Sequence, residues 1–82
     1  MPRFYFDVYN GHGEIHDEEG LELESHSAAS RIAIDSIRSM IAEDARTGLI
    51  DLKGRIEIRA EARNLLLTVA FSDAFQIRGP AQ

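Results

Sequence analysis

The sequence predicts an α+β fold, a two-layer sandwich in which one antiparallel sheet packs against one helix. Two observations carry this prediction. Apolar and polar residues alternate near both ends of the chain, as in half-buried strands, and a long stretch between them repeats its apolar residues every three to four positions. The resulting order is strand, strand, helix, strand, strand, and hairpins on either side of one helix are typical of this architecture. Residues 1–82 are enough for a single domain.

The first strand is expected over residues 3–9. One face would carry Phe4, Phe6 and Val8, and the other Arg3, Tyr5, Asp7 and Tyr9. Residues 10–13 (Asn-Gly-His-Gly) are the strongest turn signal in the chain, because Asn and Gly adopt positive φ at little cost. A short return strand at 14–16, a second turn at 17–20 and a short extended piece at 21–24 follow.

The helix is expected to run from Ala28 to a left-handed C-cap at Gly48. Either Ser25 or Ser27 can cap its N-terminus by accepting a hydrogen bond from an amide of the first turn. The predicted apolar stripe consists of Ala29, Ile32, Ala33, Ile37, Met40, Ile41 and Ala45.

Two later strands are expected at residues 55–60 and 65–71, joined by a turn in which Asn64 is left-handed. The core-facing residues would be Ile56, Ile58, Leu65, Leu67, Val69 and Phe71, whereas Leu66 would lie on the opposite sheet face. The tail, residues 73–82, is expected to form an added edge strand or a segment exchanged with a second copy.

Composition and charge narrow the function classes. Fourteen acidic against nine basic residues give a net charge of -5, which disfavours binding to nucleic acid or to an anionic membrane. The absence of cysteine excludes disulfides and thiolate metal sites. No apolar run approaches the roughly 18 residues of a membrane helix, and the start lacks a signal-peptide core. We therefore expect a cytoplasmic protein.

The acidic turn supplies the candidate metal ligands, which are His16, Asp17, Glu18 and Glu19. Imidazole nitrogen and carboxylate oxygen suit a borderline divalent metal. Because no helical spacing fixes these ligands, a solvated acidic loop is the favoured interpretation. No nucleophile elbow or similar signature links the serines and histidines, so neither enzymatic activity nor a cofactor is expected.

The sheet face opposite the helix is the candidate partner surface. Arginines interleaved with aromatics are typical of platforms for single-stranded nucleic acid, but charge pairs across the strands are the favoured interpretation on a molecule this acidic. Apolar residues of the last strand and the tail extend this surface. The candidate partner-binding residues are Arg3, Tyr5, Tyr9, Arg55, Arg59, Leu66, Phe75 and Ile77.

A homodimer is expected from the size of the core and from the last strand. The core is close to the smallest that stands alone, and no disulfide supplements it. A strand that is apolar on both faces is usually covered on both. Two copies would meet face to face or by tail exchange at an edge. The alternative is a tail folded over its own sheet.

Three segments carry a resemblance. The start Met-Pro-Arg-Phe-Tyr-Phe-Asp, then Asp17–Gly20 and the helix start at Ala28-Ala29 resemble a family of small bacterial proteins classed as a domain of unknown function. The likeness spans nearly the whole chain and departs at residues 61–64, where an Asp-x-x-Gly turn would be expected. It implies the fold and no activity.

The order of β-hairpin, acidic turn and alanine-bearing helix is also similar to HicB-type antitoxin domains. The leading hypothesis is a non-enzymatic protein-interaction module that associates with itself through its open sheet face or edge. An antitoxin-type regulatory protein that holds a partner and a small metal-binding protein are the alternatives.

Overall fold

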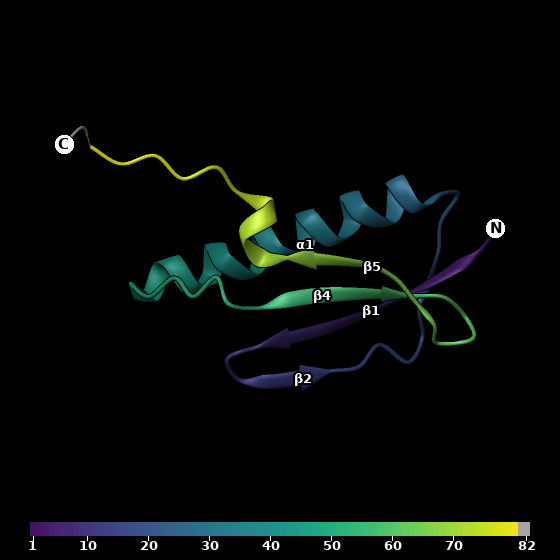
Figure 1. The fold of residues 1–82 in the computed structure, drawn as a ribbon. Helices are drawn as coiled ribbons and strands as arrows, with labels where there is room; N and C mark the ends of the chain where they lie inside the picture. The colour runs from purple at the N-terminus through teal and green to yellow at the C-terminus, as the bar shows by residue number, and fades with distance from the viewer. Residues whose placement is uncertain (81–82) are drawn as a thin grey trace.

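A computed structural model describes residues 1–80 and confirms the α+β fold (Figure 1). The strands form an antiparallel sheet in the order β2-β1-β4-β5, and one long helix lies against one face of it. The elements are β1 (Arg3–Asn10), β2 (Gly13–Ile15), β3 (Leu21–Glu22), α1 (His26–Thr47), β4 (Arg55–Arg59), β5 (Leu65–Ala70) and the 3-10 helix η1 (Phe71–Ala74).

Strand β1 is central in the sheet, with β4 along one side and two short strands along the other. Its pairing with β4 places Phe6 opposite Ile58. On the other side, β2 pairs with the last residues of β1, and β3 pairs with Arg3 and Phe4. Because β3 continues the path of β2 along β1, the two form one edge that the acidic turn interrupts. We call β2, residues 16–20 and β3 the split edge.

The core lies between α1 and the inner face of the sheet. Its helical side is a row at a spacing of four, consisting of Ala29, Ala33, Ile37 and Ile41. The alanines let the helix approach the sheet closely. The other side is formed by Phe4, Ile56, Ile58, Val69 and Phe71. At Gly54 a Cβ atom would come within 2.5 Å of the Phe71 ring, so only glycine fits there.

Both helix caps follow from local sequence. The Ser25 hydroxyl accepts a hydrogen bond from the Ala28 N–H at 3.1 Å, so Ser25 and not Ser27 is the N-cap. Gly48 ends the helix in the left-handed region at φ 93°, as predicted. The predicted apolar stripe was too wide, because Ile32 is 36% exposed and Ala45 is also exposed. A spacing of four places a narrower row against the sheet.

The turn and bulge between β4 and β5 correct two predictions. The left-handed residue is Arg63, at φ 69°, and not Asn64. A bulge shifts the register after Ile58, which pairs with Leu67, so that Arg59 pairs with Leu65. One extra residue reverses which side chain faces the core. Leu65 is therefore 49% exposed, and Leu66 packs against the core instead of the open face.

Residues 73–80 do not form the added edge strand that is one of the two predictions for the tail. After β5 the chain turns into η1, and residues 75–80 leave the body without regular structure (Figure 1). Phe75 packs against the core, whereas Ile77 is 76% exposed. Residues 81–82 lie outside the described residues. Across residues 1–80, no helix has the combination of length and apolar character that crossing a bilayer requires.

Candidate interaction surfaces

Two buried carboxylates organise the sheet face opposite α1. Asp7 on β1 and Glu57 on β4 lie directly opposite each other in the sheet, and they are only 1% and 9% exposed. Two adjacent carboxylates repel each other strongly where water is excluded, so this pair needs cations close by.

Arginines from β4 and from the following turn supply these cations. Arg63 pairs with Asp7, and the Arg59 Nε lies 3.5 Å from the same carboxylate. Glu57 accepts hydrogen bonds from Arg59 and, at 3.0 Å, from the Arg55 Nε. The hydrogen bonds from Arg55 and Arg59 hold the pKa of Glu57 below its usual value, although its burial acts in the opposite direction.

The tyrosines of β1 complete this layer. The Arg55 guanidinium lies 4.2 Å from the centre of the Tyr9 ring, and that of Arg63 lies 5.4 Å from the centre of the Tyr5 ring. The structure thus brings together four of the candidate partner-binding residues, which are Tyr5, Tyr9, Arg55 and Arg59. Both arginines form ion pairs with carboxylates, and Arg55 also stacks on the Tyr9 ring. Arg3 is separate, because it pairs with Glu22 at the split edge. The favoured interpretation of this face as charge-paired therefore agrees with the structure.

The acidic turn is a loop with exposed Glu18 and Glu19 that Asp17 anchors to the sheet. The Asp17 carboxylate accepts hydrogen bonds from the N–H groups of Phe6, Glu19 and Gly20 at 3.0–3.2 Å. The Asp17 N–H in turn donates to Asp7 at 2.9 Å. Burial raises the pKa of Asp17, but these hydrogen bonds and the charge of Arg63 outweigh it and leave this pKa lowered. The Asp-x-x-Gly pattern of residues 17–20 is the local sequence signal for a turn closed by the Asp17 side chain.

The four candidate metal ligands do not converge on one point. His16 lies beside Asp7 and Glu14, whereas the Asp17 carboxylate faces backbone amides and Glu18 and Glu19 are exposed. Over residues 1–80, no three His, Asp or Glu side chains lie close enough together to hold a metal ion. The geometry gives the metal hypothesis no support.

Strand β5 forms the second edge of the sheet. All six of its residues are uncharged, whereas the split edge carries Glu14 and Glu22. Within the part of the chain that the structure describes, β4 is the only strand that pairs with β5. The Ala70 N–H donates to the Asp73 carboxylate, so this amide at the end of β5 is not free to pair with another strand.

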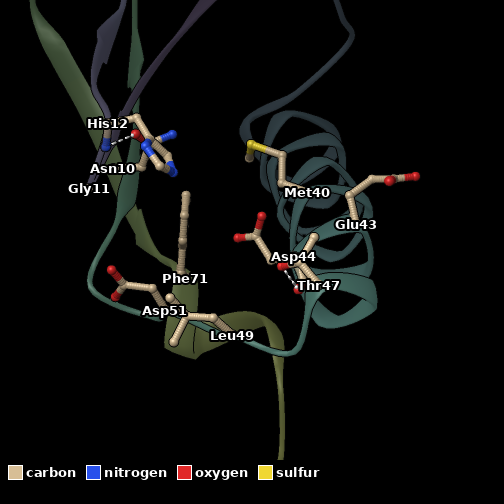
Figure 2. Close-up of a pocket in the computed structure, with 10 residues that line it drawn as sticks. All are labelled: Asn10, Gly11, His12, Met40, Glu43, Asp44, Thr47, Leu49, Asp51 and Phe71. Carbon is tan, nitrogen blue, oxygen red and sulfur yellow. Dashed lines mark hydrogen bonds between the residues drawn. The ribbon is translucent and has the colours of Figure 1, made fainter.

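A cleft of about 530 Å³ separates the β1–β2 hairpin from the C-terminal half of α1. Figure 2 shows Phe71 standing between the hairpin and the helix, Met40 on the helix, and the Asp44 carboxylate reaching from the helix into the space. Glu43 and Asp51 also line the cleft, which was not predicted from the sequence. No local pattern joins these residues, since they come from three separate segments.

The fold and these surfaces define a small α+β protein with a charge-paired sheet face and one uncharged sheet edge. The chain belongs to the family described as a domain of unknown function, DUF6894, whose family model matches residues 3–72. This confirms the resemblance found in the sequence. No curated protein and no solved structure matches the chain.

Proposed function

We propose that the protein is a non-enzymatic interaction module that pairs with a second copy of itself through the outer edge of β5. The observation that carries this proposal is the free edge itself. It is six residues long and has neither the charges nor the proline that usually protect an exposed edge strand.

Backbone geometry supports pairing at this edge. The Phe71 N–H donates to the Gly54 carbonyl at 2.9 Å, on the side of β4. Alternate residues of a strand direct their amides to opposite sides, so Thr68 directs its backbone groups away from β4. Two copies of β5 related by a two-fold axis would form an antiparallel ladder and join the two sheets into one. The open face, in contrast, carries ion pairs among Asp7, Glu57 and Arg59, which favour face-to-face association less than an uncharged edge favours strand pairing.

Sedimentation equilibrium from low to high micromolar concentration tests this proposal. We expect the parent to exceed its monomer mass of 9.2 kDa as concentration rises. Thr68→Lys should weaken dimerisation about tenfold or more. The two introduced lysines, one from each copy, would lie close together across the two-fold axis and repel each other. Thr68 is exposed and lies opposite Glu57, so the variant should stay folded.

The matched control is Ser39→Lys, which adds the same charge at an exposed position on α1. It should dimerise like the parent, and circular dichroism should show both variants folded. A parent that sediments at 9.2 kDa throughout would disprove self-association. If Thr68→Lys dimerises as well as Ser39→Lys, the β5 edge is not the interface.

A further inference from the structure

The cleft beside α1 combines an apolar floor with uncompensated negative charge. Met40 and Leu49 contribute apolar surface beside the ring of Phe71, which is only 3% exposed, and Asp44 reaches into the space next to them (Figure 2). Among the described residues, the carboxylates that line the cleft form no ion pair, in contrast to those of the open face. Such a cleft is complementary to a segment that places a cation next to an apolar side chain.

The tail of this chain has that chemistry. It presents Ile77, which is 76% exposed, directly followed by the exposed Arg78. After Phe75 the tail extends outward without regular structure (Figure 1). Residues 75–80 span about 20 Å when extended, which is long enough to enter a cleft on a neighbouring molecule.

The tail is held on the side of α1 away from this cleft in its own chain. The Arg38 Nε donates to the Ala74 carbonyl at 2.9 Å, and Phe75 packs against the core. Residues 75–78 line a separate groove with Arg38, Ile41, Ala42 and Ala45, whereas the cleft is lined by Met40, Glu43, Asp44 and Thr47. At 100° per residue, these two sets face opposite sides of the helix.

We propose that the cleft binds the tail of a second copy, with Ile77 against Met40 and Leu49 and with Arg78 paired with Asp44. This contact uses neither β5 nor the sheet edge, so it stands independently of the proposed dimer. In the assembled protein it would add a second, salt-sensitive contact between copies, because Asp44 is partly exposed and salt screens charge pairs that water reaches.

A labelled peptide with the sequence of residues 74–80 tests this contact when it is titrated with the full-length protein and followed by fluorescence anisotropy. We expect saturable binding that weakens as salt is added. Asp44→Asn in the protein and Arg78→Gln in the peptide should each weaken binding about tenfold, as expected when one partner of an interfacial charge pair is lost. The matched control is Asp35→Asn, which removes an exposed carboxylate of α1 outside the cleft and should bind like the parent.

Two outcomes would overturn the proposal. One is the absence of saturable binding by the peptide, and the other is equal binding by the Asp44→Asn and Asp35→Asn variants. The Thr68→Lys variant separates this contact from the sheet-edge dimer, since it should lose dimerisation and still bind the peptide. As a second measurement, Asp44→Arg combined with the Arg78→Asp peptide should restore binding that either change alone abolishes.

Discussion

Asp7 shows how one residue connects distant parts of this chain. It lies on β1, yet its cation partners are Arg59 and Arg63, which come more than fifty residues later. Arg63 also adopts the left-handed conformation that closes its turn, which costs a non-glycine residue about 1–2 kcal/mol. The ion pair with Asp7 gives a physical reason for an arginine at this position.

We predict that Asp7→Asn destabilises the protein by about 3 kcal/mol, because it leaves guanidinium groups beside a buried position without their counter-charge. The control is Glu22→Gln, which breaks the exposed pair with Arg3 and should cost less than about 1 kcal/mol. Urea denaturation of both variants measures the difference. Similar losses for the two would mean that the Asp7 cluster is no stronger than a surface pair.

At the scale of the helix, the decisive feature is the spacing of the buried residues. Ile37 is fully buried in the row that faces the sheet, whereas Ile32 sits beside that row and is over a third exposed. The same side chain therefore occurs in two environments on α1.

Ile37→Ala should lower the free energy of unfolding by about 2–5 kcal/mol, because it removes a large side chain from the closed core. Ile32→Ala should cost about 1 kcal/mol or less, since water already reaches this position. Thermal melts of both variants provide the measurement. Equal shifts in Tm would show that the wider stripe predicted from the sequence is correct after all.

Features that depend on neighbouring residues were predictable from the sequence, whereas features that depend on contacts between distant segments were not. The Asn-Gly turn, the cap at Gly48 and the alternation of β4 each depend on neighbouring residues, and all appear in the structure. The exchange of roles between Leu65 and Leu66 depends on a bulge against β4, which no pattern within β5 encodes.

The candidate site was predictable to a similar degree. Alternation in β1 and β4 placed the tyrosines and arginines on the open face, but Arg63 was assigned only to a turn. Its role depends on the folding of that turn over β1.

At the scale of the whole molecule, the charge-paired layer makes stability depend on pH. Burial is outweighed by hydrogen bonds at both Asp17 and Glu57, so the pKa of each carboxyl group lies below its usual value in the folded protein. Carboxyl groups of this kind contribute stability above their unfolded pKa of about 4, and that contribution is lost as the pH falls through the lower folded values.

We expect the free energy of unfolding to be nearly constant between about pH 7 and 5 and to fall below about pH 4. Glu57→Gln should be less stable than the parent at pH 7 and should show a smaller fall in acid, because glutamine has no carboxylate to take up a proton as the pH falls. Urea denaturation at each pH measures both curves. A parent curve that stays flat down to about pH 2 would contradict this expectation.

The split edge also bears on aggregation. Sheets with two open, uncharged edges add copies at both sides and can grow into amyloid-like fibres. In this sheet β2 and β3 are three and two residues long, and between them the Asp17 carboxylate occupies the Phe6 amide that an incoming strand would need. In a pair of molecules joined at β5, both outer edges of the combined sheet would therefore be split edges, which are acidic and interrupted. In the proposed dimer, the hydrophobic sequence of β5 would promote association without seeding a fibre, because the sheet would stop growing after the second copy.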